Sequence, residues 1–368
     1  MKLRRLLKWT TKIFAGIFVA LLIAGFIGYW GSTNECDQNT TAPANPMRAV
    51  RFCEYGVVTI ADVEKPVPKD NQVLIKVRTA SLNFIDVSLI QGPWIGRLFF
   101  GLRKPRDPQV GRDIAGEVEA VGKDVTQFKP GDKVFGLARG SLAGYACASE
   151  RALVILPANV TFEQAASIPL AGLTALQGLR KGNIQSGQKV LINGATGGVG
   201  TFAVQIAKSF GADVTAVCST RNVELVRSIG ADRVIDYTKE DFTGSEQRYD
   251  MIFDNVCNHS VAERRHVLNP KGTCVLVGLG GIGLSSSQAV WRIVRNLTAS
   301  AFSSFGDQKF VNYITTVNRD DLALLGDLIG SGKVTPVIER TCKFDDTPET
   351  LRILNQGHAR GKTVVTIE

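Results

Sequence analysis

A glycine-rich stretch near the middle of the chain has the residue types and the spacing of a phosphate-binding turn. Ala195, Gly197 and Gly200 keep the spacing of the motif G-x-G-x-x-G, with alanine in the first position. The stretch follows the apolar run KVLIN and precedes TFAVQIAKSFGA, whose apolar residues recur at helical spacing. Glycine allows the backbone to approach a pyrophosphate, which the N-H groups of the helix N-terminus can bind. The context predicts a nucleotide site, although a tight turn of another α/β protein has a similar pattern.

The residues about twenty positions after this turn indicate which nucleotide it would be. NAD-binding units usually offer Asp or Glu to the ribose 2'-hydroxyl at this point, after their second strand. Here the run Val214–Cys218 is followed by Ser219, Thr220 and Arg221, with no acid. A hydroxyl and a guanidinium suit a 2'-phosphate, so we expect NADP(H) rather than NAD(H). In the alternative interpretation, Arg221 only begins the next helix and is exposed to solvent.

These residues need a parallel sheet to bring them together. Further short apolar runs, Arg233–Asp236, Tyr249–Asp254 and Thr273–Val277, follow with helical or loop segments between them. Such alternation of strand and helix predicts a doubly wound α/β domain. Before about residue 165 the pattern changes to short strands with turn signals, which predicts a β-rich domain.

Composition and charge exclude several classes of protein. The 368 residues are 44% hydrophobic and 21% charged, which is typical of a folded chain of about two domains. The net charge is +9, but residues 1–46 contain five basic and two acidic side chains, and the other charges form no basic block. We therefore expect no nucleic-acid partner. The seven cysteines and three histidines show no metal-ligand spacing and no complete disulfide set, so each is expected to be a core thiol or a surface imidazole, with no metal site.

An apolar run near the N-terminus predicts a membrane anchor. Residues 13–30 contain eighteen consecutive residues without a charge, preceded by the basic flank 1–12 and followed by the polar linker 31–46. We therefore expect a single-pass membrane protein that contacts the lipid bilayer through residues 13–30. A cleaved signal peptide is the alternative interpretation. The positive-inside rule places the amino terminus in the cytoplasm and the remainder on the opposite side, where free NADPH is not expected. The sequence leaves open on which side of the membrane the large domain lies. It also leaves open whether the physiological chain starts at Met47.

Beyond Met47 the chain resembles the medium-chain dehydrogenase/reductase superfamily, in its zinc-free quinone oxidoreductase and enone reductase branch. The resemblance is carried by MRAVRFCEYG, TASLNFIDVSLIQG, GRDIAGEVEAVGKDV, FKPGDKVFGL, AASIPLAGLTALQGL, NGATGGVG, GKVTPVIERTCKF and GHARGKTVVT, in this order. It implies a chaperonin-10-like catalytic domain over residues 47–165, completed by residues 318–368. It also implies an NADP-binding Rossmann domain over residues 166–317. The family chemistry would be hydride transfer to a quinone, enone or related carbonyl acceptor.

The chain departs from its zinc-dependent relatives at both expected ligand positions. It has Asn83 where they have Cys, and Gly111-Arg112-Asp113 where they have a G-H-E triplet. The four-cysteine structural-zinc lobe is also absent from the sequence. The resemblance therefore implies hydride transfer without a metal Lewis acid, and leaves the general acid unassigned.

The resemblance also suggests individual site residues. Asn83 and Asp86 would be the catalytic pair beside the nicotinamide, and the other expected contacts belong to the cofactor. Gly197, Gly198 and Val199 would hold the pyrophosphate, and Ser219, Arg221 and Tyr237 resemble the 2'-phosphate pocket. Asn255 and Val256 would lie beside the ribose or nicotinamide, Thr174 resembles a cofactor contact, and Lys362 would close the site. Each has an alternative role: Asn83 and Asp86 as turn or capping residues, Thr174 as an ordinary helix hydroxyl, Tyr237 as a half-buried core ring and Lys362 as a solvated charge.

Two further questions stay open in the sequence. The stretch Trp94–Lys104 reads WIGRLFFGLRK and could be a hydrophobic lid on the substrate mouth, a lipid-contacting face, or a loop packed on its own domain. The leading function is an NADPH-dependent oxidoreductase acting on a small carbonyl or quinone substrate. The alternatives are a membrane-tethered NADP(H)-binding sensor or scaffold, and an alcohol dehydrogenase. Family members are often dimers, which leaves a homodimer open.

Overall fold

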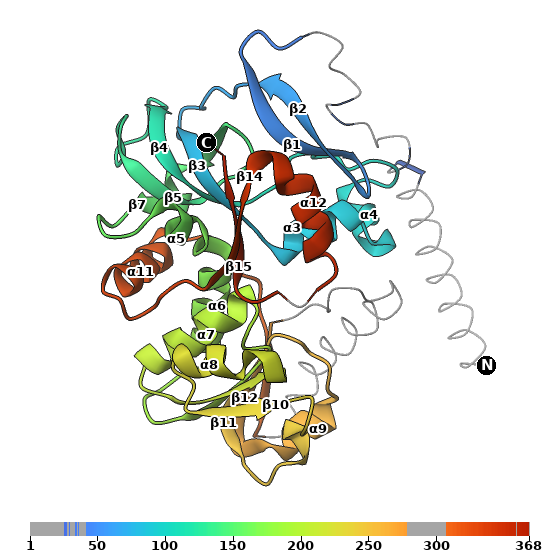
Figure 1. Ribbon diagram of the computed structural model, residues 1–368, viewed down its shortest axis with the longest axis vertical. Helices are drawn as coiled ribbons and strands as arrows, with labels where there is room; N and C mark the ends of the chain where they lie inside the picture. The colour runs from blue at the N-terminus through green and yellow to red at the C-terminus, as the bar shows by residue number, and fades with distance from the viewer. Residues whose placement is uncertain are drawn as a thin grey trace, which may run out of the picture.

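The structure is a computed structural model and contains two large sheets, one above the other in the view of Figure 1. It describes residues 42–277, 307–357 and 359–367, together with Phe26, Ile27, Tyr29, Asn34 and Cys36. The chain builds most of one sheet first, crosses to the second, and returns to the first with its last strands (Figure 1).

The second sheet has six strands in the order β10-β9-β8-β11-β12-β13, and all its described pairings are parallel. Its strands are β8 (Lys189–Asn193), β9 (Asp213–Cys218), β10 (Arg233–Asp236), β11 (Tyr249–Asp254), β12 (Leu268–Leu276) and β13 (Lys309–Asn312). In chain order this arrangement is 3-2-1-4-5-6, the doubly wound order of dinucleotide-binding domains. The predicted parallel sheet is confirmed, and β12 begins five residues earlier than the sequence pattern predicts.

Helices cover both faces of this sheet, because alternate side chains of its strands are apolar on both sides. One face packs on α6 (Pro169–Lys181) and α7 (Gly198–Ser209) in a core that also contains residues of α8 (Val223–Ser228) and α11 (Arg319–Gly330). The other face, with Leu191, Val217 and Ile252, packs around Phe242 of the short 3-10 helix η3 (Phe242–Gly244) and residues near α9 (Val261–His266). A capping box of Ser260 and Glu263 begins α9.

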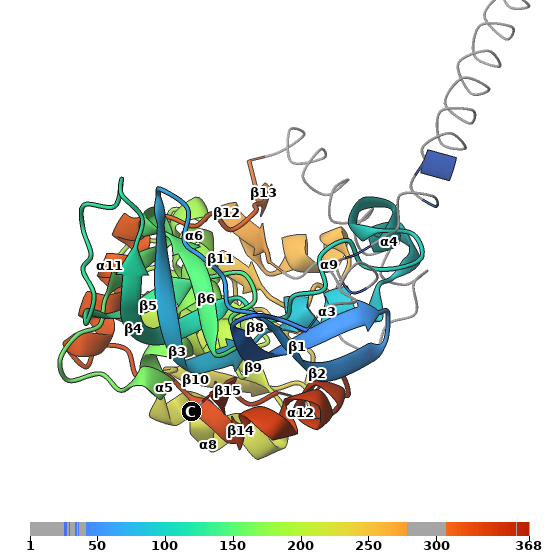
Figure 2. The same cartoon turned by 90° about the horizontal axis from the view of Figure 1, so that it is seen from above.

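The first sheet has seven strands in the order β14-β15-β3-β4-β5-β7, with β6 paired to β3 beside this path. Its strands are β3 (Gln72–Leu82), β4 (Asp113–Val121), β5 (Lys133–Leu137), β6 (Tyr145–Ser149), β7 (Leu153–Ile155), β14 (Ile338–Lys343) and β15 (Lys362–Thr366). Figure 2 shows β3, β4, β5 and β6 curving around a common core. The 3-10 helix η1 (Glu150–Ala152) leads into β7, and α5 (Phe162–Ala166) leads toward the second sheet.

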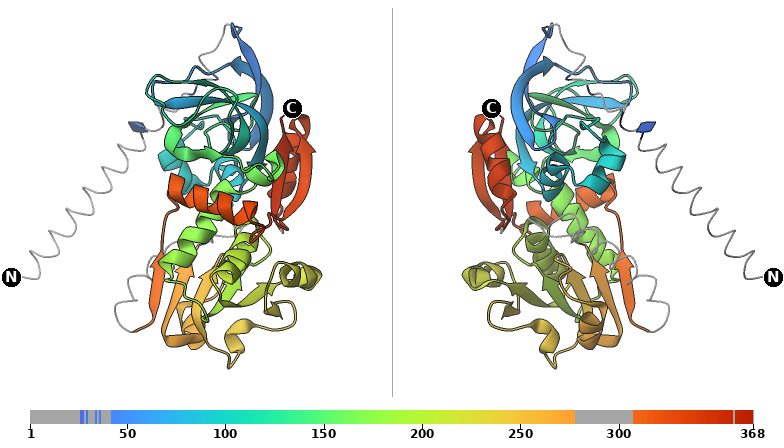
Figure 3. Two further views of the ribbon diagram at one scale, coloured as in Figure 1. Left: turned by 90° about the vertical axis from the view of Figure 1, so that its left-hand side faces the viewer. Right: turned by 90° about the vertical axis from the view of Figure 1, so that its right-hand side faces the viewer.

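A hairpin of β1 (Pro46–Glu54) and β2 (Val57–Glu64) packs beside this sheet, together with α3 (Phe84–Gln91), α4 (Trp94–Phe100) and α12 (Thr347–Leu354). The C-terminal strand β15 pairs antiparallel with β3 and parallel with β14, so the end of the chain completes the sheet that its N-terminal part begins. Figure 3 shows these last elements lying against the early strands. Two chain regions far apart in sequence thus meet at the carboxyl end of β3.

The prediction of a membrane-anchored protein is corrected by the structure. Among the described residues, no helix is both long enough and apolar enough to cross a bilayer. Of the expected span 13–30, only Phe26, Ile27 and Tyr29 belong to the described residues, and the rest of it lies outside them, as does the basic flank 1–12. The lipid partner and the membrane location are therefore withdrawn.

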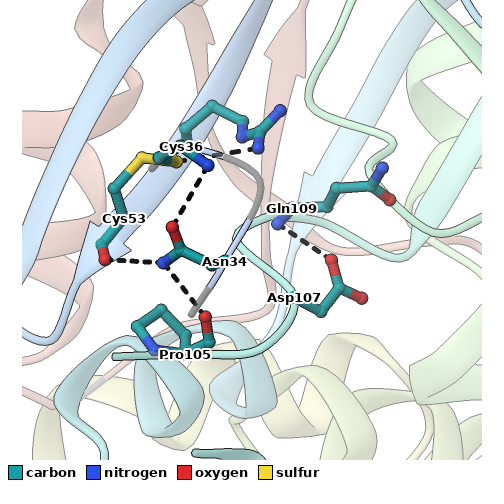
Figure 4. Close-up of a disulfide and its surroundings, with 7 residues drawn as sticks. Asn34, Cys36, Cys53, Pro105, Asp107 and Gln109 are labelled. Atoms are coloured by element: carbon teal, nitrogen blue, oxygen red, sulfur yellow. Dashed lines mark hydrogen bonds between the residues drawn. A yellow bond between two sulfur atoms is a disulfide. The ribbon is translucent and has the colours of Figure 1, made fainter. Parts of the chain in front are cut away.

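The expectation that every cysteine is a separate thiol is wrong for one pair. Cys36 and Cys53 form a disulfide with 6.0 Å between their Cα atoms. Figure 4 shows the amide of Asn34 beside it, donating to the carbonyl oxygens of Cys53 at 2.9 Å and Pro105 at 3.1 Å. Two residues of the expected linker 31–46 are thus bonded to other segments: Cys36 to β1 by the disulfide, and Asn34 to β1 and to the loop before β4 by hydrogen bonds.

Candidate active site

The glycine-rich turn lies between β8 and α7, at the carboxyl edge of the parallel sheet. Gly194 has φ +80°, a conformation that favours glycine, and Gly197 is the N-cap residue of α7. A Cβ atom on Gly200 would lie 2.1 Å from the carbonyl oxygen of Gly194, so the helix can begin this close to the turn only without a side chain there. At Gly197, by contrast, the nearest atom to an added Cβ would be 3.9 Å away. The turn therefore offers helix N-terminal N-H groups beside open space, which fits a pyrophosphate.

Asn255 and Val256 follow β11, the sheet neighbour of β8 on the side where the strand order reverses. The backbone N-H of Asn255 donates to the carbonyl of Asn193 at 3.1 Å, and a Cβ on Gly194 would meet the Val256 side chain at 2.7 Å. Open α/β sheets bind ligands at this reversal point. The structure therefore brings Asn255 and Val256 to the glycine-rich turn.

A buried ion pair holds this loop in place. Asp254 accepts hydrogen bonds from the side-chain amide of Asn193 at 2.9 Å and from the backbone of Cys257 at 2.8 Å. Its other oxygen accepts from Nε of Arg264 at 2.7 Å, and both of these side chains are fully buried. Asp254 thereby ties the end of β11 to β8 and to α9.

A second group of polar residues lies after β9 and β10, and we call Ser219, Thr220, Arg221, Asp236 and Tyr237 the outer cluster. The hydroxyl of Thr220 donates to Asp236 at 2.6 Å, and the backbone N-H of Tyr237 donates to the carbonyl of Cys218 at 2.9 Å. The hydrogen bond from Thr220 is the main cause that lowers the pKa of Asp236 to about 2. Tyr237 is 56% exposed, so its alternative role as a half-buried core ring is wrong, and Arg221 is exposed on the same edge.

A third group is buried where β3, β4 and β15 meet, and we call Ser81, Asn83, Asp86, Asp113 and Lys362 the inner cluster. Asp113 accepts hydrogen bonds from Ser81 Oγ at 2.8 Å, Asn83 Nδ2 at 2.9 Å and Lys362 Nζ at 3.1 Å through its Oδ2 atom. Lys362 also donates to Oδ1 of Asn83 at 2.6 Å. The side chain of Lys362 is 3% exposed, so its alternative role as a solvated charge is wrong.

The inner cluster reaches the glycine-rich turn through the start of β15. The backbone N-H of Gly361 donates to the carbonyl of Thr196 at 2.7 Å, and Gly361 forms an isolated bridge with Gly197. An added Cβ on Gly198 would lie 2.9 Å from Cδ of Lys362. The C-terminal strand thus places a buried ammonium against the turn expected to hold the cofactor.

Asp86 links the inner cluster to a cavity. It lies in the first turn of α3, where its Oδ2 atom accepts from the backbone N-H of Asn83, the helix N-cap residue, at 2.8 Å. Burial raises the pKa of Asp86 to about 7, against the hydrogen bond from Asn83 that lowers it. The charge of Asp113 raises the pKa further, and those of Lys362 and Arg112 lower it. The capping role of Asn83 and Asp86, an alternative from the sequence, is therefore confirmed, and it leaves Asp86 on the cavity wall.

The cavity has a volume of about 220 Å³ and a largely apolar wall with charged residues. Its lining includes Asp86, Tyr55, Phe99, Phe100, Arg106 and Arg112. Phe99 and Phe100 end α4, so the stretch Trp94–Lys104 contributes part of the cavity wall. A flat aromatic or conjugated molecule would fit such a wall.

Thr174 lies in α6, and its hydroxyl is engaged by protein groups. Oγ1 donates to the carbonyl of Leu170 at 2.7 Å and lies 3.0 Å from Oγ1 of Thr315. The carbonyl of Thr174 also accepts from the hydroxyl of Tyr313. These contacts match the alternative of an ordinary helix hydroxyl.

Comparisons with known proteins agree with this fold. The alcohol dehydrogenase GroES-like domain family matches residues 69–158, and the zinc-binding dehydrogenase family matches residues 229–365. The 2-methylene-furan-3-one reductase of Solanum lycopersicum is 33% identical over 87% of this chain and 79% of its own. The chain belongs to the medium-chain dehydrogenase/reductase superfamily.

Further relatives of this superfamily member are oxidoreductases by name. The chloroplastic NADPH-dependent alkenal/one oxidoreductase of Arabidopsis thaliana is 34% identical over 89% of this chain and 82% of its own. The solved structure of the quinone oxidoreductase from Coxiella burnetii is 30% identical, has a TM-score of 0.74, and covers 88% of this chain and all of that one. This dehydrogenase/reductase is accordingly an oxidoreductase that uses a nicotinamide cofactor and has a GroES-like and a Rossmann-like domain.

The residues of this family member do not fit zinc, although one family description mentions it. Within the described ranges, no group of three or more His, Cys, Asp or Glu side chains is placed to hold a metal ion. At the two positions that resemble ligand positions stand Asn83, hydrogen-bonded to the ammonium of Lys362, and the cationic Arg112. A fixed ammonium at this place repels a divalent cation. No step described below uses a metal.

Sequence reasoning missed several residues that position the site. Ser81 lies near the end of β3, Asp113 begins β4 and Asp254 ends β11, and all three side chains are buried next to apolar residues. A polar residue next to an apolar run is buried and must find partners, which is a usable signal. The partners of Asp113 and Asp254, Lys362 and Arg264, could not be read from the sequence, because residue spacing does not show which distant segments pair.

Proposed function

We propose that this chain reduces a quinone, an enone or a related conjugated carbonyl compound with NADPH. The observation that carries the proposal is the position of the inner cluster. It joins the glycine-rich turn, through Lys362, to a cavity with aromatic walls, through Asp86. The names of the relatives, an enone reductase, an alkenal/one oxidoreductase and a quinone oxidoreductase, support this substrate class.

NADPH supplies a hydride, and the protein binds and orients it. Gly197, Gly198 and Val199 at the start of α7 would hold the pyrophosphate, and Asn255 and Val256 would flank the ribose and nicotinamide. The outer cluster supports NADPH over NADH. Ser219, Arg221 and Tyr237 offer hydroxyls and a guanidinium to a 2'-phosphate, and the acid of the cluster, Asp236, is bonded to Thr220.

In this proposal Asp86 is the proton donor. Reduction of a C=C or quinone group requires one proton beside the hydride, and Asp86, with a pKa raised to about 7, is partly protonated at neutral pH. The amide nitrogen of Asn83 donates a hydrogen bond to Asp113, and its amide oxygen accepts one from Lys362. Asn83 therefore acts as a positioning residue that fixes the start of α3. Lys362 positions Asn83 and the turn in the same way.

The test is oxidation of NADPH and of NADH by the full chain, followed at the absorbance of the reduced nicotinamide with a panel of quinones, enones and saturated aldehydes. We expect turnover of quinones or enones with NADPH preferred. Tight NADPH binding without turnover of any acceptor would contradict the proposal and favour a sensor or scaffold. Turnover of saturated aldehydes alone would favour an alcohol dehydrogenase. The domain limits at residues 165 and 317 and a homodimer stay predictions.

A further inference from the structure

The cavity beside Asp86 contains a cation, Arg112, whose charge lowers the pKa of Asp86 without a direct bond to it. Arg112 lines the cavity and is half-buried. Within the described part of the chain, its guanidinium makes no hydrogen bond and no ion pair. Other arginines around the cavity are engaged: Arg97 donates to the carbonyl of Gly92 at 2.6 Å and stacks on Tyr55, and Arg139 pairs with Asp107 at 3.0 Å.

The backbone of Arg112 is fixed at the edge of the inner cluster. Its carbonyl accepts from the N-H of Ala138 at 2.8 Å, and its neighbour Asp113 belongs to β4 and is fully buried. Gly111, on its other side, has φ +94° and no room for a Cβ, which would lie 2.5 Å from Ser141 Oγ. The start of the Arg112 side chain is therefore held in place, and its guanidinium shares a cavity with Asp86.

We propose that Arg112 binds the carbonyl oxygen of the acceptor and stabilises the negative charge that forms on it during hydride transfer. This proposal rests on the proposed function. The guanidinium has several N-H donors in one plane, two of which can point at one oxygen or at its two lone pairs. Donors that are fixed before the reaction, in a site shielded from water, stabilise an oxyanion without reorganisation.

The reaction balances with the residues named. The β-carbon of an enone accepts hydride from the reduced nicotinamide, the C=C electrons move toward the carbonyl, and the oxygen takes the negative charge beside Arg112. The enolate then accepts the proton of Asp86 at its α-carbon, and the carbonyl bond forms again. Asp86 regains its proton from water. A quinone accepts the hydride, which carries both electrons, and then one proton. It gives a hydroquinone after a proton shift.

The other polar groups near the cavity are less suited to this role. Asn83 already uses its amide nitrogen and oxygen within the inner cluster, and Lys362 donates to Asn83 and Asp113 below the cavity wall. Arg106 also lines the cavity, but it is exposed, so water screens its charge. Arg151 in η1 is exposed and does not line the cavity, so it is the matched control for Arg112.

The experiment compares Arg112→Met, Arg112→Lys and Arg151→Met with the wild-type full chain. With an enone that the wild type reduces, we expect Arg112→Met to lower kcat about 100-fold and to change KM little, because the lost interaction is strongest in the transition state. Arg112→Lys should recover part of kcat, and free guanidinium ion should partly rescue Arg112→Met. Arg151→Met should stay within about threefold of the wild type, as expected for an exposed charge outside the site.

A binding readout separates this role from a structural one. 4-Nitrophenol mimics the enolate oxygen, and its visible absorbance reports whether the phenol or the phenolate is bound. The wild type and Arg151→Met should favour the phenolate form by about tenfold or more, and Arg112→Met should lose that preference. Circular dichroism and NADPH affinity, measured on each variant, should match the wild type.

The outcomes distinguish the two proposals. If the wild type reduces no enone or quinone, the proposed function fails. If it does, and Arg112→Met keeps both its kcat within threefold and its preference for phenolate, the role of Arg112 is overturned. Equal losses in Arg112→Met and Arg151→Met would also overturn it, since general positive charge would then explain the effect. A selective loss in Arg112→Met with partial recovery in Arg112→Lys supports it.

Discussion

The inner and outer clusters differ in how their charges are compensated, by a buried partner in the first and by water in the second. In the inner cluster Asp113 and Lys362 are almost completely buried, and each compensates the other. In the outer cluster Arg221 and Tyr237 are exposed, and Lys239, 3.5 Å from Asp236, is 69% exposed. Removing one partner of a buried ion pair lowers stability strongly, because the remaining charge is not solvated by water. Removing one partner of an exposed pair costs little, because water solvates the remaining charge. The inner cluster should therefore govern both folding and chemistry, and the outer cluster should govern only the choice of cofactor.

The strongest test of this difference is Lys362→Met. It leaves the buried Asp113 carboxylate without its cation, and we expect a loss of about 3 to 5 kcal/mol in the free energy of unfolding. Urea denaturation followed by circular dichroism measures it. Lys333→Met, on an exposed loop, is the control and should change little. The double variant Lys362→Met with Asp113→Asn should be more stable than Lys362→Met alone. A loss below 1 kcal/mol in Lys362→Met would show that water already compensates the pair.

Asp86→Asn tests the chemical part of the inner cluster. As the proton donor, Asp86 must be protonated, so kcat of the wild type should fall as the pH rises through about 7. Asp86→Asn should lower kcat at pH 6 by about 100-fold or more, and should remove this alkaline decline. The groups that face Asp86 are Asn83, Asp113, Lys362 and Arg112, so the same profile should be measured in Arg112→Lys as a control. A pH profile of Asp86→Asn identical to that of the wild type would exclude Asp86 as the acid.

The same substitution should have the opposite effect on stability. The pKa of Asp86 rises from an ordinary 3.8 to about 7 in the fold, so the native state binds more protons than the unfolded chain between these values. The free energy of unfolding contributed by Asp86 therefore falls as the pH rises from 3.8 to about 7, by about 4 kcal/mol at most. Asp86→Asn keeps an oxygen for the N-H of Asn83 and should be more stable than the wild type at pH 8. Thermal unfolding at pH 5 and pH 8 measures the difference.

Arg221→Ala tests the outer cluster, with a smaller expected effect. Loss of the contact with the 2'-phosphate should weaken NADPH binding by about ten- to a hundredfold, or 1.5 to 3 kcal/mol, and leave NADH binding and stability almost unchanged. Nicotinamide fluorescence gives both affinities. Arg227→Ala, an exposed arginine of α8 paired with Glu224 at 2.9 Å, is the matched control. An equal loss for NADPH and NADH would indicate that Arg221 does not distinguish them.

The outer cluster can be predicted from the sequence, whereas the contacts within the inner cluster cannot, and the reason is physical. The glycine-rich turn, β9, β10 and β11 follow from local patterns, because a parallel sheet places the carboxyl ends of its strands at one edge. The outer cluster could thus be predicted from residues close to those ends. The inner cluster joins residues 81–86, Asp113 and Lys362. Asn83 and Lys362 are 279 positions apart, and no local pattern encodes that contact. The disulfide of Cys36 and Cys53 was missed for the same reason, since a cysteine count does not show which residues pair.

Sequence and structure lead to different expectations for Thr174. Its substitution has the smallest effect on stability and cofactor binding of those predicted. The resemblance suggests a cofactor contact, but its hydroxyl is bonded to Leu170 and lies near Thr315. Thr174→Val keeps the shape and removes these bonds, so we expect a loss of about 1 kcal/mol in stability and less than about a twofold change in NADPH affinity. Thr174→Ser keeps the hydroxyl and is the control. If Thr174→Val instead binds NADPH tenfold more weakly with unchanged stability, the hydroxyl contacts the cofactor, and the binding surface extends from the glycine-rich turn onto α6.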